Sequence, residues 1–167
     1  DKTIFVLSTT KGNVSLLEKN VCGVDDNRVL LGVMANVISC HFGNSNMPIV
    51  VSNACISGVC AQIVAKRCLE SSKYDNAVVI GADEQSPFIV SGFMSFRALS
   101  PEVCHPFSKN RNGLNLGEAA ATIIYQRCDN VIDGWQAVKG AIRNDANHIS
   151  GPSRTGEGSY RALKYVM

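Results

Sequence analysis

The sequence has 167 residues, a formal net charge of +2 at pH 7, and 46% hydrophobic against 18% charged residues. This balance is typical of a globular domain with a substantial core, and it excludes a disordered chain. The Lys and Arg residues are scattered, and no apolar run approaches the roughly 18 residues of a membrane span, so neither a nucleic-acid partner nor a membrane partner is indicated.

The first predicted elements form a β-α-β unit. Thr3–Thr9 reads TIFVLST and predicts a buried strand, because an apolar run without alternation is typical of a parallel sheet. A helix with apolar residues at helical spacing follows from Val29 and ends near Gly43. The apolar run Pro48–Val51 then predicts a second buried strand.

Cys55 stands where this second strand gives way to a helix. Apolar residues recur at helical spacing from Ile56 onward, and this second helix is expected to end near Ser71. The predicted strand-to-helix turn lifts the Cys55 side chain out of the sheet and places it at a helix N-terminus. Backbone N–H groups at such a position favour a thiolate and can hold a developing oxyanion. The same spacing also fits a small buried cysteine that fills core space.

The middle of the chain completes an α/β pattern. Asn76–Asp83, NAVVIGAD, predicts a third strand, and the order β-α-β-α-β predicts a parallel, layered α/β sheet. Pro87–Leu99 predicts a short helix packed beneath the Cys55 turn. Ser100–Gly117 is a polar loop, and long ordered loops of this kind are often functional.

The last part of the chain predicts two further strands. Ala119–Gln126 and Trp135–Ile142, joined by a turn near residues 129–134, are expected to form an antiparallel pair at the sheet edge. Residues 143–158 are rich in Gly, Ser and Asn and predict a loop, and Tyr160–Val166 opens a helix. The chain begins without Met inside a strand pattern and ends inside a helix, so we expect it to be a piece of a longer protein.

Three stretches resemble the β-ketoacyl-[acyl carrier protein] synthases. Asn53–Gly58, NACISG, resembles the nucleophile motif T-A-C-x-S-G, and Gly92–Pro101, GFMSFRALSP, resembles G-F-x-x-x-x-A-L-S. Pro106–Gly113 with Gly117–Ala119 resembles P-F-D-x-x-R-D-G followed by G-E-G/A. The chain departs from that last pattern where Ser and Asn replace the common Asp, at Ser108, Asn110 and Asn112.

The resemblance implies a fold and a set of site residues. The fold is one half of a thiolase-like fold, with residues 1–158 as the N-terminal synthase domain, its opening strand absent, and residues 159–167 as the start of a helix leading to a second half. Cys55 is implied as the catalytic nucleophile. Phe93 is implied at the acyl-chain pocket, and Arg97 is implied at the carrier-protein surface. Glu118 is expected to be buried, paired and bracing the loop.

The implied reaction is a decarboxylative Claisen condensation in fatty acid or polyketide biosynthesis. The partner is an acyl carrier protein with acyl and malonyl groups on its phosphopantetheine, the assembly is a homodimer, and no metal or other cofactor is required. The family's two catalytic histidines lie in motifs that this chain lacks, so the chain alone is expected to be inactive.

Two other classes of function remain open. A cysteine hydrolase would use Cys55 with His105 or His148, and it requires a histidine within hydrogen-bond reach of the thiol. A non-catalytic, synthase-like interaction domain is the second alternative, although the retained cysteine argues against it. Among acyl-transfer relatives, thiolase is less favoured because the Phe107–Gly117 loop matches the synthases better.

The seven cysteines show neither CxxC spacing nor a Cys/His cluster. They therefore predict reduced thiols rather than a disulfide framework or a metal site. Together with the absence of a signal-peptide pattern, this usage predicts a cytoplasmic location.

Overall fold

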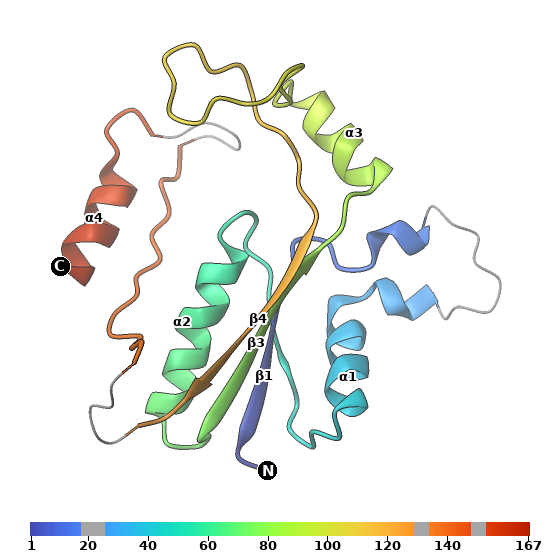
Figure 1. The fold of residues 1–167 in the computed structure, drawn as a ribbon, viewed down its shortest axis with the longest axis vertical. Coiled ribbons are helices and arrows are strands. Elements are labelled where there is room, and N and C mark those ends of the chain that lie inside the picture. The colour runs from blue at the N-terminus through green and yellow to red at the C-terminus, as the bar shows by residue number, and fades with distance from the viewer. Residues whose placement is uncertain (18–25, 129–133, 148–152) are drawn as a thin grey trace. The chain divides into compact units, whose positions relative to one another are not determined.

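The computed structural model describes residues 1–17, 26–128, 134–147 and 153–167 (Figure 1). The chain divides into two units, Asp1–Arg127 and Cys128–Met167. The first unit contains the sheet and the Cys55 turn. The second contains helix α4 (Glu157–Val166).

The sheet of the first unit is built from β1 (Thr3–Ser8), β2 (Ile49–Val51), β3 (Asn76–Asp83) and β4 (Ala119–Gln126), in the order β2-β1-β3-β4. β1 is parallel to β2 and to β3, whereas β4 is antiparallel to β3. The predicted parallel β-α-β-α-β arrangement is confirmed.

Helices lie on both faces of this sheet, with α1 (Leu31–His41) on one side and α2 (Ser57–Glu70) on the other (Figure 1). Successive side chains of a strand point to opposite faces, so β1 contributes side chains to the packing on both the α1 face and the α2 face. Ile4 and Val6 pack with Ala61 and Ala65 of α2 in the main core. The small side chains of α2 let the helix approach the sheet closely, which fixes the position of its N-terminus.

The opposite face of β1 meets the α1 layer. Phe5 is buried and stacks on Phe42 just after α1, with 5.8 Å between ring centroids. Leu7 is also buried on this face. Burial on both faces explains why the strand shows no hydrophobic alternation.

Three short helices complete the first unit: η1 (Val14–Leu17), η2 (Asp26–Val29) and α3 (Pro87–Ser95). α3 starts with Ser86 as its N-cap, whose side chain accepts a hydrogen bond from the Ile89 N–H, and Pro87 follows in the first turn. Its principal contact is with η1. The expected packing of α3 beneath the Cys55 turn stays a prediction.

The predicted strand at Trp135–Ile142 is wrong. The segment has no regular structure, and Trp135 is fully exposed. β4 instead pairs along its whole length with β3, from Ala119 opposite Asp83 to Gln126 opposite Asn76. The antiparallel edge therefore lies between β3 and β4. Alternating apolar residues form a strand only where the segment also pairs with a sheet edge, and residues 135–142, which belong to the second unit, pair with none of the four strands. The turn expected to join the pair falls partly on 129–133, outside the described residues.

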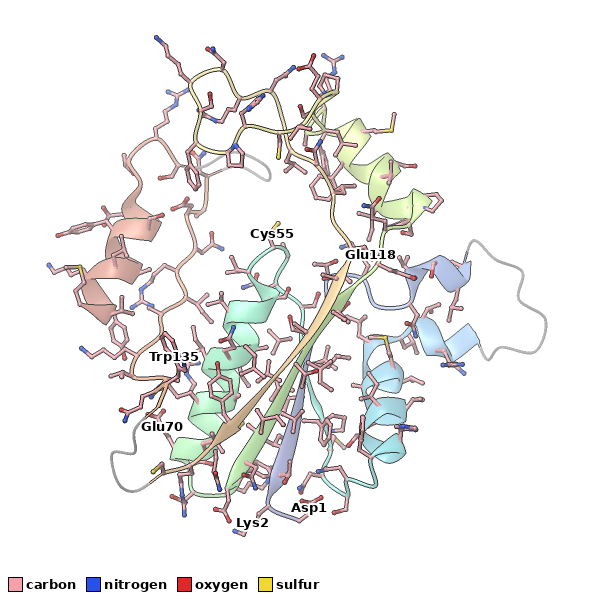
Figure 2. All side chains as sticks on the ribbon, in the orientation of Figure 1. Asp1, Lys2, Cys55, Glu70, Glu118 and Trp135 are labelled. Atoms are coloured by element: carbon pink, nitrogen blue, oxygen red, sulfur yellow. The ribbon has the colours of Figure 1, made fainter. Side chains whose placement is uncertain are left out.

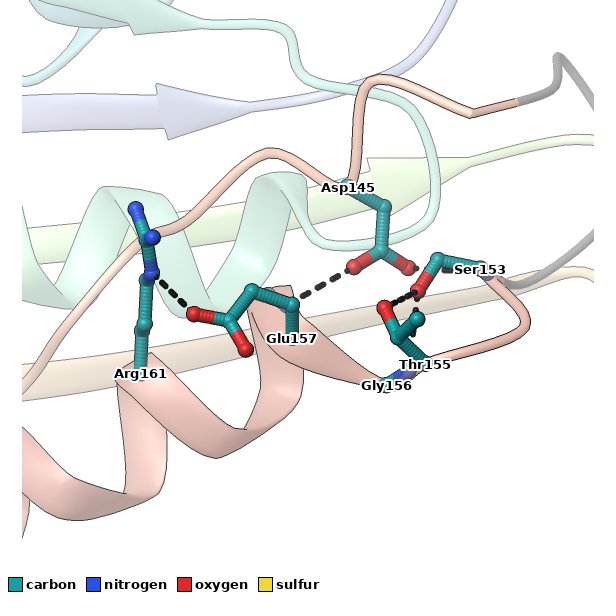
Figure 3. Close-up of polar contacts among 7 residues, drawn as sticks. Asp145, Ser153, Thr155, Gly156, Glu157 and Arg161 are labelled. Carbon is teal, nitrogen blue, oxygen red and sulfur yellow. Dashed lines mark hydrogen bonds and ion pairs between the residues drawn. The ribbon is translucent and has the colours of Figure 1, made fainter.

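In the second unit, Asp145 holds the start of α4 (Figure 3). Its carboxylate accepts the Gly158 N–H at 3.1 Å and the Ser153 N–H at 3.3 Å, and the Ser153 hydroxyl accepts the Gly156 N–H at 2.9 Å. A carboxylate at this position complements the positive end of the helix dipole. A Cβ added to Gly158 would clash with the Asp145 carboxylate oxygen, so a larger residue here would displace that carboxylate.

Candidate active site

Residues 52–56 form the turn between β2 and α2, and Cys55 is exposed within it. The Ile56 N–H donates to the Asn53 carbonyl at 3.3 Å, and the Ser57 N–H donates to the Ala54 carbonyl at 3.1 Å. Figure 2 shows the Cys55 side chain above the N-terminal end of α2, pointing away from the sheet. The predicted strand-to-helix placement is confirmed, and the alternative of a buried core cysteine is wrong.

The turn contains backbone strain just before Cys55. Ala54 has φ 46°, in the left-handed region, which costs an L-residue about 1–2 kcal/mol. The Ser57 hydroxyl accepts the Asn53 N–H at 2.7 Å and donates to the Ala54 carbonyl at 2.6 Å. Each such bond contributes about 0.5–1.5 kcal/mol, so the two together roughly offset the strain.

The N-terminus of α2 supplies donors beside Cys55. Ile56, the residue that precedes the helix, provides no side-chain cap. The N–H groups of a helix's first turn have no intrahelical carbonyl partner, and they lie at the positive end of the helix dipole. Such groups are suited to hold a negatively charged oxygen that forms on a carbon attacked by the thiol.

Asp83, at the carboxyl end of β3, fixes the loop beside the Cys55 turn. Its Oδ1 accepts hydrogen bonds from the Thr9 hydroxyl at 2.9 Å and from the Thr10 N–H and hydroxyl, both at 2.8 Å. The Thr10 carbonyl in turn accepts the Ser52 hydroxyl at 3.2 Å. Asp83 was not among the site residues predicted from the sequence. The available signal was a carboxylate directly at the end of an apolar strand.

Phe93 and Arg97 belong to α3 and its end. Phe93 is half-buried and Arg97 is exposed. The Ala98 N–H donates to the Phe93 carbonyl at 3.1 Å and the Arg97 N–H donates to the Met94 carbonyl at 2.9 Å, with φ of 53° at Arg97. This is the Schellman closure of a helix, whose left-handed position usually holds glycine. The substrate-binding roles expected of both residues stay predictions.

Glu118 is paired as expected, but the expectation that it is buried is wrong. Its Oε2 accepts the Gln85 N–H at 2.9 Å, and the Gln85 side chain donates to the Leu116 carbonyl at 2.9 Å. Glu118 is exposed because it directly precedes β4, most of whose residues are themselves exposed. Together with Asp83 and Glu84 it lines a cavity of about 620 Å³ whose apolar wall includes residues of α1.

The histidines do not complete a hydrolase site in the part of the chain that the structure describes. His105 is exposed in the loop after α3, and no hydrogen bond joins Cys55 to a histidine among the described residues. His41 ends α1 and meets the Phe42 ring edge-on, with 5.0 Å between centroids. His148 lies outside the described residues.

The described residues contain no group of three or more His, Cys, Asp or Glu side chains placed to hold a metal ion. None of their helices is both long and apolar enough to cross a membrane.

The comparison with family models matches residues 8–130 to "Beta-ketoacyl synthase, N-terminal domain". Among curated proteins, the putative mitochondrial 3-oxoacyl-[acyl-carrier-protein] synthase of Schizosaccharomyces pombe is 24% identical over 151 residues, covering 82% of this chain and 35% of that protein. The 3-oxoacyl-[acyl-carrier-protein] synthase 2 of Synechocystis sp. is 29% identical over 127 residues, covering 68% of this chain and 30% of that protein. The chain thus spans about a third of the length of these relatives.

Solved structures share the fold. A ketosynthase, ApeO, in complex with its chain length factor, ApeC, from Xenorhabdus doucetiae has a TM-score of 0.77 at 24% identity, covering 98% of this chain and 44% of the other. A β-ketoacyl synthase from Burkholderia phymatum has a TM-score of 0.66 at 23% identity, covering 77% of this chain and 36% of the other. The expected layered α/β half of a thiolase-like fold is confirmed.

Proposed function

The chain belongs to the family of β-ketoacyl synthase N-terminal domains, and on that premise we propose that it carries the acyl-accepting cysteine of a β-ketoacyl-[acyl carrier protein] synthase. The observation that carries the proposal is the exposed Cys55 at the N-terminus of α2, inside the matched residues 8–130. The family match alone would fit a non-catalytic relative, whereas an exposed thiol on a strained strand-to-helix turn fits a nucleophile.

In the first step the Cys55 thiolate attacks the carbonyl carbon of an acyl thioester on the carrier protein's phosphopantetheine. A carbon–sulfur bond to Cys55 forms, the bond to the carrier's sulfur breaks, and the carrier thiolate leaves and takes up a proton. First-turn N–H groups of α2 beyond that of Ser57, which donates to the Ala54 carbonyl, support the negative oxygen of the tetrahedral intermediate. No metal or other cofactor takes part in this step.

In the second step a malonyl group on the carrier protein loses carbon dioxide and becomes an enolate. The enolate carbon forms a carbon–carbon bond with the acyl carbon, and the bond to Cys55 breaks. Within this scheme Phe93 lines the acyl-chain pocket and Arg97 meets the carrier protein. Glu118 braces the loop that joins α3 to β4. These assignments rest on the motifs that contain them, Gly92–Pro101 and Gly117–Ala119.

The assembly that we propose is a dimer in the cytoplasm, formed through the β2 edge of the sheet. β2 has three residues and pairs with β1 on one side, and an apolar edge strand of this kind needs cover. The Xenorhabdus ketosynthase is in complex with a chain length factor, so the partner is either a second copy or a related synthase-like subunit. Sedimentation of the full-length protein alone, which is expected to give a dimer, distinguishes the two.

The test of the reaction is carbon dioxide release from malonyl-carrier protein by the full-length protein in the presence of an acyl-carrier protein. Wild-type protein is expected to release carbon dioxide and form a lengthened product, and Cys55→Ala is expected to form none. A lengthened product from Cys55→Ala would exclude Cys55 as the acyl acceptor. Release of the carrier thiol with neither carbon dioxide nor product would instead favour the cysteine hydrolase.

A further inference from the structure

Ser57 is the first residue of α2, two positions after Cys55, and only 3% of its surface is exposed. Its hydroxyl is used in both directions, since it accepts the Asn53 N–H at 2.7 Å and donates to the Ala54 carbonyl at 2.6 Å. A hydroxyl has one hydrogen, so donation to Ala54 fixes its orientation. Both hydrogen bonds of the hydroxyl therefore go to Asn53 and Ala54, the two residues that precede Cys55.

Further bonds tie the same two residues. The Ala54 carbonyl also accepts the Ser57 N–H at 3.1 Å. The Asn53 side-chain amide donates to the Cys60 sulfur at 3.4 Å, and Cys60 is buried one turn further along α2. Both Asn53 and Ala54 are thus hydrogen-bonded to residues of α2. Ala54 nevertheless has φ 46°, a conformation that an alanine leaves readily when nothing holds it.

We propose that Ser57 is a positioning residue for the nucleophile: its hydroxyl holds Ala54 in the left-handed conformation and so sets the direction of the Cys55 sulfur. This inference rests on the proposed function of Cys55 as the acyl acceptor. A serine that only starts a helix would stabilise α2 and leave the reactivity of Cys55 unchanged, and this difference makes the inference testable.

The first variant is Ser57→Ala in the full-length protein. Two rates are measured: alkylation of Cys55 by iodoacetamide, followed by peptide mapping, and condensation with acyl- and malonyl-carrier protein. Displacement of a reacting group by about 1 Å can cost roughly 10²-fold in rate, so we expect a loss of this order in kcat with little change in KM. Cys55 alkylation is expected to slow as well.

Ser39→Ala is the matched control. Ser39 is equally buried in a helix, in α1, and its hydroxyl oxygen lies 3.4 Å from each of the Asn44 and Asn46 carbonyl oxygens, either of which can accept its hydrogen. This variant also removes a buried hydroxyl, but away from the Cys55 turn. We expect it to lower Tm without changing either rate.

The decisive variant is the pair Ala54→Gly with Ser57→Ala. Glycine adopts positive φ without strain, so the turn no longer needs the hydroxyl. We expect the pair to regain at least tenfold of the rate lost in Ser57→Ala. Unchanged rates in Ser57→Ala, or a loss that Ala54→Gly does not relieve, would overturn the inference. If Ser57→Ala does not fold, Ser57→Thr replaces it, because threonine keeps the hydroxyl. We expect Ser57→Thr to alkylate at the wild-type rate. A folded Ser57→Thr with a slower alkylation of Cys55 would overturn the inference.

The two readouts separate this inference from the proposed function. Condensation that survives in Cys55→Ala removes the proposed function, whereas the alkylation rates still report whether Ser57 sets the direction of the Cys55 thiol. Conversely, loss of condensation in Cys55→Ala with unaltered alkylation in Ser57→Ala supports the function and rejects the role of Ser57.

Discussion

At the scale of single residues, the site depends on conformations that the chain adopts only under constraint. Ala54 and Arg97 both have positive φ, and each lies at the end of an element that bears on the proposed chemistry. Ala54 is held by the hydrogen bond that the Ser57 hydroxyl donates to its carbonyl, and Arg97 is held by the backbone bonds of a Schellman closure. The Arg97 side chain therefore leaves α3 in a direction fixed by the backbone.

Cys55 is predicted to be the most reactive thiol of the described residues. Cys40 is its matched control, because it is also exposed but lies in the last turn of α1, at the negative end of the helix dipole. Limiting iodoacetamide followed by peptide mapping is expected to label Cys55 first. Labelling of Cys40 at the same or a higher rate would show that the position at the start of α2 gives Cys55 no advantage.

Replacement of Gly113, in the loop before β4, is predicted to lower the stability of the fold. It has φ +85°, and an added Cβ would lie 2.7 Å from backbone atoms of Leu99 and Ser100. Overpacking of this kind lowers the free energy of unfolding by about 1–3 kcal/mol, and the strain of an alanine at positive φ lowers it further. Gly113→Ala should lower the urea midpoint of unfolding accordingly. Gly92→Ala in α3, where nothing lies within 4 Å, should raise it slightly, and equal effects would refute this account.

The sequence predicted the Cys55 turn but not the residues that hold it. A cysteine between an apolar run and a helical repeat is a local signal. The partners of Asp83 lie 73 and 74 positions away along the chain, and no local pattern identifies them. The expected burial of Glu118 failed for a related reason, since burial depends on what covers β4 rather than on the residues beside Glu118.

At the scale of elements, apolar pattern and length predicted most boundaries. β3 and β4 have the predicted limits, Asn76–Asp83 and Ala119–Gln126, because turn residues bound continuous apolar runs there. Trp135–Ile142 carried a similar pattern without becoming a strand. Strand formation requires pairing with a partner edge, and the periodicity of one segment contains no information about whether that segment reaches an edge.

The packing of α2 against the sheet predicts a pH dependence. Burial raises the pKa of the Cys68 thiol on α2, and the nearby Lys73 charge opposes this only in part. The thiol of the unfolded chain ionises near its ordinary value of about 8.5, and that of the folded chain ionises at higher pH. Its contribution to stability is therefore complete below about pH 8.5 and is lost as the pH rises through the folded value.

The measurement is urea unfolding of wild type and Cys68→Ala between pH 8 and pH 10.5 under reducing conditions. Wild type should lose more stability than Cys68→Ala over this interval. Burial also raises the pKa of Tyr125 on β4, so part of the loss should persist in the variant at the upper end. Parallel curves for the two proteins would contradict the role of Cys68.

At the scale of the whole molecule, strand β4 exposes more apolar side chains than is usual for a strand of a packed sheet. β4 reads AAATIIYQ, yet Tyr125 is its only half-buried residue and the rest are exposed. Exposed apolar faces of this kind promote association. The 167-residue chain alone is therefore expected to self-associate.

Ile124→Ser is predicted to reduce this association. Ile124 is 70% exposed, so its replacement should change the free energy of unfolding by no more than about 0.5 kcal/mol. The substitution lowers the apolar area of the exposed strand. Sedimentation velocity at several concentrations is the measurement, with the equally apolar Ile124→Val as control. Identical association of both variants would show that β4 is not the associating surface.

The central claim is that Cys55 accepts the acyl group, and the most direct measurement is the mass of the protein after incubation with an acyl-carrier protein in the absence of malonyl groups. The full-length protein should gain one acyl mass, located by peptide mapping on Cys55 and removed by hydroxylamine, as expected of a thioester. Cys55→Ala should gain none. An acyl group on another residue, or an unmodified Cys55 in a protein that still condenses, would contradict the account.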